Sequence, residues 1–389
     1  MEQKSAEQKS VEQKRQEKWK REDRHMYADY SNSLVNLSCS VLKRFGAEYG
    51  HQTLPCADNW MEKGYRNVVV ILLDGMGCDA MNYHLKQDGF FRKYYRCAVS
   101  SVFPPTTTAA TTTMESGLTP AEHGWLGWSL YFSEIQKIVN AFTNQDQYER
   151  VQAEDYHVAS RYIPYTKIYE KINRAGVGHG YSVSHFGTNK IETLDELCGE
   201  VQRLCGQEGE KYIYAYWEEP DSIMHDTGCR SESVTANMRY LEQKIAEMSH
   251  QLEDTLLIVT ADHGHIDLSH YILTDYPDIL EMLRLSISVE ARAAAFYVKE
   301  GCEEEFSKRF CRHFGEEFLL FSAEEMLEWQ IFGDGVPHEK FRELAGDFLA
   351  VGIAHKGFAW SRNLPMFLSN HAGMTEQEMI VPLIVVEKP

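Results

Sequence analysis

The sequence has no long hydrophobic run. No apolar stretch reaches the roughly 18–20 residues that a membrane-spanning helix needs. The segment MEQKSAEQKSVEQKRQEKWKRED at the start is charged and contains no apolar core of the kind found in secretory signal peptides. We therefore expect a cytoplasmic protein without a membrane partner.

Paired cysteines and positive charge are also scarce. The nine cysteines are odd in number and form no C-x-x-C pair, which favours reduced thiols inside a cell over a disulfide framework. Only 39 lysine and arginine residues stand against 58 aspartate and glutamate residues, which gives a net charge of −19. A chain this acidic repels nucleic acid, so we expect no nucleic-acid partner. An anionic substrate would need a local positive charge, for which a metal ion is the simplest source.

Short apolar runs separated by amphipathic segments dominate the 389 residues. Helical patterns, for example at 165–176 and 235–252, lie between the apolar runs. The alternation predicts an α/β fold: a doubly wound, mostly parallel sheet with helices on both faces. The runs typical of buried parallel strands are 67–73, 212–217, 255–261 and 379–386, with weaker candidates at 97–103, 178–183 and 293–298.

The pattern changes in two further regions. Residues 1–25 repeat EQKS or EQKR with almost no apolar residues, which predicts a charged tail that is disordered or helical. Residues 266–365 become acidic and amphipathic, with phenylalanines at 306, 310 and 314. We assign 266–365 to an inserted α+β cap subdomain. The catalytic domain then comprises 26–265 and 366–389.

Aspartate and histidine residues follow three of the strongest predicted strands. Ligands of open α/β sheets bind beyond the carboxyl ends of the strands, so these side chains should converge. Each aspartate alone is explained equally well as a helix cap or as the partner of a structural histidine. Three such sites together favour a metal centre, and mixed carboxylate and imidazole ligands suit two ions of zinc or manganese. The residues are Asp74 after 67–73, Asp221 and His225 after 212–217, and Asp262 and His263 after 255–261.

Six threonines occupy the eight positions from Thr106 to Thr113. Pro104 and Pro105 before them and Gly117 after them indicate a short helix, although threonine is only a middling helix former. One explanation is packing. The other is that a hydroxyl is required at the first turn, where backbone N–H groups favour an anion and a bound metal would activate the hydroxyl.

Taken together, these motifs resemble the alkaline phosphatase superfamily, in its type I phosphodiesterase/nucleotide pyrophosphatase branch. The resemblance covers about residues 66 to 386 and depends on LLDGMG, PPTTTAATTTMESGLTPAEHG, EEPDSIMHDTG, TADHG and NHAGMTEQEMIVPLIV in that order. It implies that Thr107 is the nucleophile, with Thr106 as the alternative. It also implies two metal sites, one formed by Asp74, Thr107, Asp262 and His263 and the other by Asp221, His225 and His371.

The resemblance implies a metal-dependent hydrolase that contains two divalent ions, with zinc favoured over manganese. Thr107 would attack phosphorus, and water would hydrolyse the resulting phosphothreonine with net retention at phosphorus. The substrate would be a small phosphoester, with nucleotides among the candidates because aromatic residues lie near the motifs. We expect Trp128 and Tyr216 to bind it, and core packing is the alternative role for both residues.

The chain departs from the family pattern beside the nucleophile. The branch usually has Pro-Asn two and three residues after this threonine, whereas Ala109 and Ala110 stand here. A phosphomonoesterase or phosphonate hydrolase is therefore the alternative function. A non-catalytic metal-binding scaffold and a hydrolase of carbon-based bonds are weaker alternatives, because the ligand set is intact and a threonine begins the helix. We expect structural roles for His123, for His265 and for Arg292, the last in a salt bridge to the cap.

Overall fold

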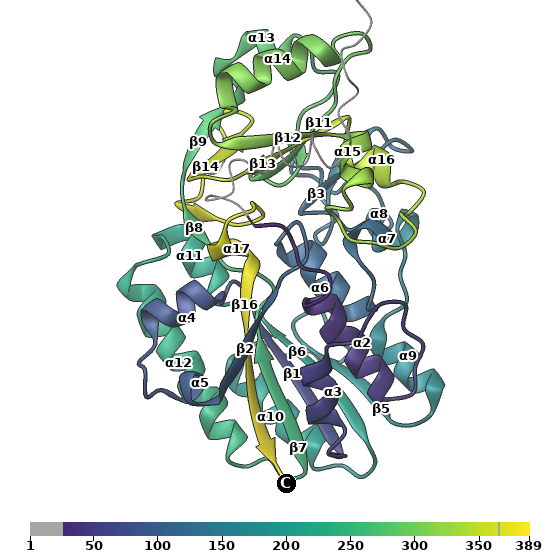
Figure 1. Ribbon diagram of the computed structural model, residues 1–389, viewed down its shortest axis with the longest axis vertical. Helices are drawn as coiled ribbons and strands as arrows, with labels where there is room; N and C mark the ends of the chain where they lie inside the picture. The colour runs from purple at the N-terminus through teal and green to yellow at the C-terminus, as the bar shows by residue number, and fades with distance from the viewer. Residues whose placement is uncertain (1–25, 365) are drawn as a thin grey trace, which may run out of the picture.

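The computed structural model describes residues 26–364 and 366–389, so the predicted tail at 1–25 lies outside the described residues. A six-stranded sheet forms the centre of the lower lobe in Figure 1. Neighbours among β7, β1, β6 and β5 are parallel, while β16 is antiparallel to both β7 and β2. The sheet order is β2 (Tyr95–Ser100), β16 (Ile380–Lys388), β7 (Thr255–Thr260), β1 (Asn67–Leu73), β6 (Lys211–Trp217) and β5 (His179–Val183).

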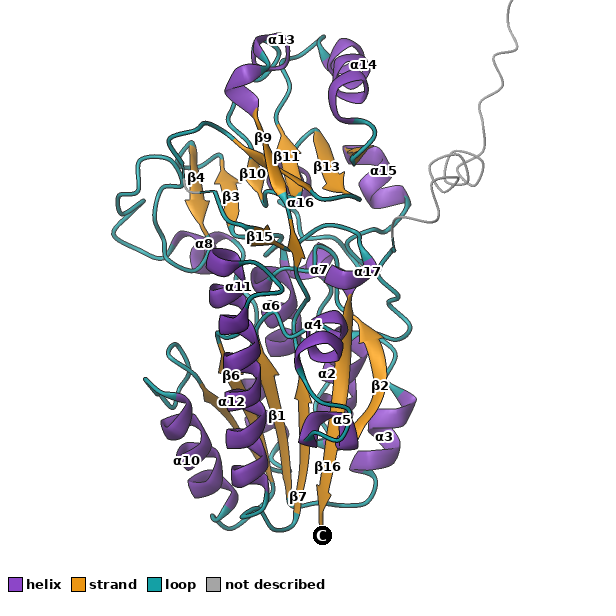
Figure 2. Cartoon of the chain, turned by 90° about the vertical axis from the view of Figure 1, so that its left-hand side faces the viewer, coloured by secondary structure: helices purple, strands orange, loops and turns teal. Residues whose placement is uncertain are grey.

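Helices cover both faces of this central sheet (Figures 1 and 2). They enclose a core in which every residue of β1 and β7 is buried, as expected of strands that are covered on both sides. The predicted α/β fold with a largely parallel sheet is confirmed. One face carries α2 (Leu34–Arg44), α3 (Pro55–Met61), α6 (Thr107–Ser116) and α9 (Ile168–Ala175); the other carries α4 (Cys78–His84), α5 (Phe90–Tyr94), α10 (Leu194–Cys205) and α12 (Glu232–Ser249).

A second sheet, antiparallel throughout, forms the upper lobe in Figure 1. The four-residue spacing of phenylalanines in α14 places all three on a buried face, in a core that also contains Phe296. The sheet order is β12 (Phe318–Ser322), β13 (Phe348–Gly352), β11 (Ala293–Phe296), β10 (Ser288–Val289), β3 (Ser129–Phe132) and β4 (Lys137–Asn140), with α13 (Pro277–Leu280), α14 (Glu303–Phe314), α15 (Ala323–Glu328) and α16 (Phe341–Ala345) around it.

The second sheet is built from two separate stretches of chain. Strands β3 and β4 come from 129–140, a segment that we expected to belong to the catalytic domain, and β3 joins the sheet by the pairing of Ser129 with Val289. The segment 293–298, a weaker strand candidate from sequence, contributes β11 to this sheet and not to the central one. Both lobes therefore receive chain from before and after residue 266.

Short elements lie between the lobes and position the loops of the site. The antiparallel pair of β15 and β8 brings residues 369–370 beside 266–267. None of the helices in the described part of the chain combines the length and the hydropathy that a membrane crossing needs. The remaining elements are α7 (Pro120–His123), α8 (Val158–Tyr162), α11 (Asp221–Thr227), α17 (Glu376–Met379), a 3-10 helix at Leu273–Asp275, and strands β8 (Ile266–Asp267), β9 (Ser269–Ile272), β14 (Lys356–Ala359) and β15 (Ser369–Asn370).

Candidate metal centre and nucleophile

Three aspartates meet at the carboxyl ends of β1, β6 and β7. Asp74 follows β1 directly, Asp221 begins α11 after β6, and Asp262 lies two residues beyond β7. The Asp221 amide donates to the Asp74 carbonyl at 3.1 Å, and the Gly75 amide donates to Asp262 Oδ1 at 3.0 Å. Gly75 has a φ of +74°, and a Cβ there would lie 3.0 Å from the Asp221 Cα. Only glycine fits this turn, which holds the three strand ends together.

Thr107 is the first residue of α6, and Thr106 is its N-cap. The Thr107 hydroxyl lies 3.2 Å from Asp74 Oδ2 and 3.3 Å from His263 Nε2. It is partly buried and lines a cavity, whereas Ala109 and Ala110 of the next turn are fully buried in the core of the lower lobe. The helix thus presents one hydroxyl to the aspartate cluster and packs its apolar residues behind it.

Two groups of side chains have ligand atoms within 4.8 Å of one another and could hold metal ions. The first comprises Asp74, Asp262 and His263, as expected from the sequence. The second includes His371, whose loop follows β15. His263 belongs to both groups, so the two sites are adjacent. The full second group is Asp221, His263, His265 and His371.

His225 and His265 differ from their expected places. The Nε2 of His225 lies 3.4 Å from Asp221 Oδ2 while its Nδ1 bonds the Ser369 carbonyl, so it contacts the cluster from outside the tight group. His265, expected to be a structural loop histidine, has its Nε2 2.5 Å from Asp221 Oδ1 and its Nδ1 3.0 Å from Ser369 Oγ. Its position two residues after His263 was the only sequence signal for this.

The acids of the cluster carry strongly perturbed pKa values. Burial, reinforced by the negative charges of Asp262 and Asp221, raises the pKa of Asp74 well above its usual range. Burial also raises the pKa of Asp262. For Asp221, burial acts upward, but the imidazoles of His225, His265 and His371 outweigh it and hold the pKa well below the usual range. The carboxyl groups of Asp74 and Asp262 therefore do not both ionise readily unless a positive charge lies nearby.

In the described part of the chain, two buried atoms of these side chains lack a hydrogen-bond partner, Asp262 Oδ2 and His371 Nδ1. Burial, together with the neighbouring His263, lowers the pKa of His371 well below its usual value and favours the neutral imidazole that metals bind. Buried carboxylates and bare acceptors of this kind are costly unless paired or bound to a cation. The donor set therefore fits divalent metal ions.

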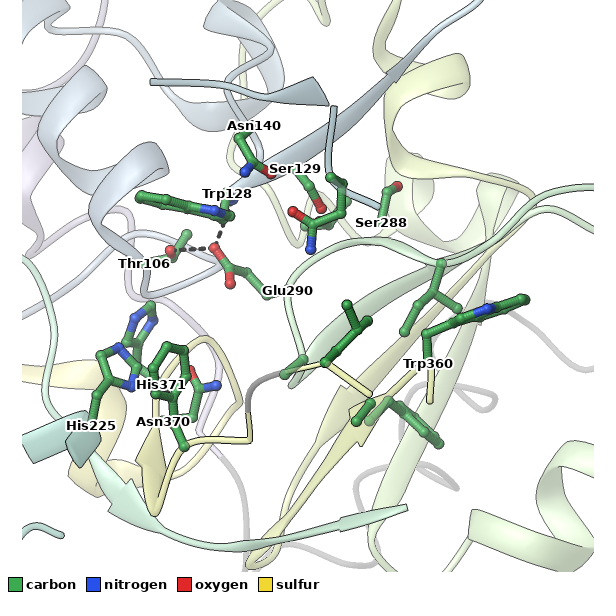
Figure 3. Close-up of a pocket in the computed structure, with 18 of the residues that line it drawn as sticks. Thr106, Trp128, Ser129, Asn140, His225, Ser288, Glu290, Trp360, Asn370 and His371 are labelled. Carbon is green, nitrogen blue, oxygen red and sulfur yellow. Dashed lines mark hydrogen bonds between the residues drawn. The ribbon is translucent and has the colours of Figure 1, made fainter. Parts of the chain in front are cut away.

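A cavity of about 500 Å³ opens beside the Thr107 hydroxyl and extends between the two lobes. Trp128, 40% exposed, lies on its wall, and its expected contact with a substrate stays a prediction. Tyr216 does not line it: its hydroxyl donates to Asp74 Oδ2 at 2.5 Å and so lies beside the metal cluster. Figure 3 shows Thr106, Trp128 and Glu290 on one side of the cavity and His225 and His371 on the other.

His123 and Arg292 have the structural roles expected of them, although Arg292 pairs with another acid than expected. His123 is buried, with its ring bonded to Thr113 Oγ1 and to the Trp125 amide. Arg292 is fully buried and pairs with Glu378 of α17 at 2.7 Å, not with an acid of the cap. Glu378 also accepts from the Gly373 amide, so this pair fixes the loop that follows His371.

Comparison with solved structures finds the same fold in other proteins. Murine ectonucleotide pyrophosphatase/phosphodiesterase 5, an inactive variant in complex with AMP, has a TM-score of 0.64 and 19% identity, covering 81% of this chain and 87% of that chain. The human protein of the same name has a TM-score of 0.64 and 18% identity, covering 82% and 87%. Phosphonoacetate hydrolase from Sinorhizobium meliloti 1021, with phosphonoformate, has a TM-score of 0.61 and 15% identity, covering 82% and 90%.

Comparison by sequence gives the family. A search of curated proteins found no match. The profile of the type I phosphodiesterase/nucleotide pyrophosphatase family matches residues 68–309, which is more than half of the chain and includes Asp74, Thr107, Asp221, Asp262 and His263. The chain therefore belongs to the type I phosphodiesterase/nucleotide pyrophosphatase family of the alkaline phosphatase superfamily.

Proposed function

We propose that this protein is a two-metal phosphoesterase that cleaves phosphodiester or pyrophosphate bonds through a phosphothreonine intermediate. The observation that carries the proposal is the position of the Thr107 hydroxyl, 3.2 Å from Asp74 Oδ2, 3.3 Å from His263 Nε2 and open to the cavity. A hydroxyl placed between a carboxylate and an imidazole, at the first residue of a helix, is suited to nucleophilic attack on an anion.

We take the metal ligands from the family resemblance, and the close approach of these side chains in the structure supports the assignment. In this proposal Asp74, Thr107, Asp262 and His263 hold one divalent ion, while Asp221, His225 and His371 hold the other. When bound, such ions lower the pKa of a coordinated hydroxyl or water and offset charge on phosphoryl oxygens. The mixture of carboxylates and imidazoles favours zinc, with manganese as the second choice.

The chain's own residues then have definite tasks in the reaction. The Thr107 hydroxyl releases its proton to solvent as its oxygen forms a bond to phosphorus and the bond to the leaving oxygen breaks, and the leaving group takes up a proton from solvent. Water attacks the phosphothreonine, which releases the phosphate product and returns the proton to Thr107. Support comes from the murine neighbour, whose AMP complex was obtained with an inactive variant that has alanine in place of a threonine.

A second candidate function is hydrolysis of phosphomonoesters or phosphonates. Ala109 and Ala110 are fully buried, so α6 supplies no amide side chain to a phosphate oxygen. The similarity to phosphonoacetate hydrolase points in the same direction. Both candidates use the same metal cluster and nucleophile, so they differ only in the substrate groups that the cavity accepts.

The test compares bis-nitrophenyl phosphate with mono-nitrophenyl phosphate as substrates of the zinc-loaded protein. The proposed function predicts the higher kcat/KM for the diester and a covalent phosphate on Thr107, detected by mass spectrometry after quenching at low pH. Thr107→Ala should abolish both signals. Turnover by Thr107→Ala at the parent rate would reject the nucleophile.

The compartment is a separate proposal. We propose a cytoplasmic location, which is supported by the nine cysteines, all of them free thiols in the structure. Labelling of the accessible thiols in freshly lysed cells tests it, because a chain from an oxidising compartment would resist the reagent until reduced.

A further inference from the structure

One acid on the cavity wall has no part in the mechanism above. Glu290 follows β10, and its Oε1 accepts hydrogen bonds from the Thr106 hydroxyl at 2.6 Å and from the Trp128 amide at 2.7 Å. Figure 3 shows its carboxyl group beside Thr106 and Trp128, with dashed lines that mark the two hydrogen bonds. Both donors are neutral, so they orient the carboxylate without cancelling its charge.

The backbone is strained where it delivers this acid to the cavity. Val289 has a φ of +73°, a conformation that is rarely adopted by a β-branched residue. Gly127 makes the close approach feasible, since a Cβ there would lie 2.7 Å from Val289 Cγ1. Strain of this kind is kept where the surrounding structure requires a particular placement, often at a functional site.

The charges around the reaction centre explain what Glu290 does. Two divalent cations would carry four positive charges, which balance the four negative charges of Asp74, Asp221, Asp262 and an ionised Thr107. The metal centre itself would then have no net charge. A phosphodiester then adds one negative charge to the site, whereas a monoester or phosphonate dianion adds two. Glu290 lines the same cavity as Thr107 and bonds the hydroxyl of Thr106, the residue next to the proposed nucleophile, so its charge acts on a phosphate bound there. Arg150 also lines the cavity but is exposed, where water screens its charge.

We propose that Glu290 sets the charge of the accepted substrate: it disfavours dianionic phosphomonoesters and phosphonates and so selects singly charged diesters. Like charges brought together in a binding site suppress the wrong partner strongly. The inference rests on the proposed function and deepens it, because it assigns the choice between the two candidate substrate classes to one side chain.

Glu290→Gln tests the proposal, because glutamine keeps an acceptor for Thr106 and Trp128 and removes only the charge. The measurement is the ratio of kcat/KM for bis-nitrophenyl phosphate to that for mono-nitrophenyl phosphate, at about pH 8.5, above the pKa of about 7 to which burial raises Glu290. The ratio should fall about tenfold in Glu290→Gln and stay within about threefold of the parent in Glu290→Asp, which keeps the charge. Glu290→Ala provides a second neutral variant in case glutamine disturbs folding.

Binding of inorganic phosphate gives a readout independent of turnover. Calorimetry on the zinc-loaded protein should show phosphate, a dianion at this pH, binding about tenfold more tightly to Glu290→Gln than to the parent. Absence of hydrolysis of either ester by the parent would reject the proposed function, while phosphate binding would still test Glu290. An unchanged ester ratio and unchanged phosphate affinity in both neutral variants would reject the role of Glu290 and leave the function standing.

Discussion

The imidazole rings of His263 and His371 stack with their centroids 3.9 Å apart and their planes 26° from parallel. His263 follows the central strand β7, whereas His371 lies in a loop just before the last strand, held there by the pairing of β15 with β8. This contact joins the two metal groups, since His263 belongs to both and His371 to the second. Changes at His371 should therefore affect metal binding before they affect the fold.

His371→Ala should release a metal ion from the protein and leave the fold intact. Its Nδ1 has no hydrogen-bond partner, so removing the ring breaks no buried hydrogen bond at that atom, while a metal ligand is lost. We expect the metal content after dialysis to fall from about two ions per chain toward one, with kcat reduced at least about a hundredfold. His179→Ala, an exposed histidine on β5, is the matched control. Retention of both ions in His371→Ala would remove this residue from the ligand set.

His265→Ala should weaken metal binding without removing a proposed ligand. The ring lies 2.5 Å from Asp221 Oδ1 and is anchored by Ser369 Oγ, so it orients the Asp221 carboxylate. Losing such an orienting partner typically costs about 10–100-fold in metal affinity. Competition with a chromophoric chelator measures this directly. His265→Asn, which keeps one hydrogen-bonding group, should recover part of the lost affinity. Equal affinities in parent and His265→Ala would show that Asp221 holds its place without this ring.

Ligands of open α/β sheets bind beyond the carboxyl ends of the strands, and this explains which parts of the site could be predicted from sequence. Asp74, Asp221 and Asp262 each follow a strongly apolar strand, so their convergence follows from local pattern and parallel topology. His371 has no such signal, because it lies in a loop, and only the family resemblance identified it. Glu290 was missed for a related reason: its place beside Thr106 depends on the pairing of β10 with β3, a contact between distant segments. Non-local sheet pairings of this kind leave no periodic trace in either segment.

Divalent metal should stabilise the whole protein, because the buried carboxylates of the cluster repel one another in its absence. Burial and mutual repulsion raise the pKa of Asp74, so the metal-free cluster destabilises the folded state. Zinc at about a hundred times its dissociation constant should add about 2.7 kcal/mol to the free energy of unfolding. For a chain of this length that corresponds to a rise in Tm of about 3 °C. Calorimetric scans with zinc and with a chelator provide the measurement, and Asp262→Asn should lose most of the difference. Identical Tm values under both conditions would argue against a metal centre here.

Glu378→Gln should destabilise the fold by about 3–5 kcal/mol at neutral pH, because it leaves the fully buried Arg292 without its counter-charge. Burial acts to raise the pKa of Glu378, but Arg292 and its hydrogen bonds outweigh this and hold the pKa below the usual 4.5. A depressed folded-state pKa means that the stabilisation is present above pH 4.5 and is lost as the pH falls through the folded-state value. The difference in free energy of unfolding between parent and variant, measured in urea, should therefore shrink on acidification.

The double variant Arg292→Met with Glu378→Gln should be less destabilised at neutral pH than Glu378→Gln alone, because no unpaired charge remains buried. If the parent and Glu378→Gln differ by the same amount at pH 7 and at the acid limit of folding, the pair is not contributing through its charges.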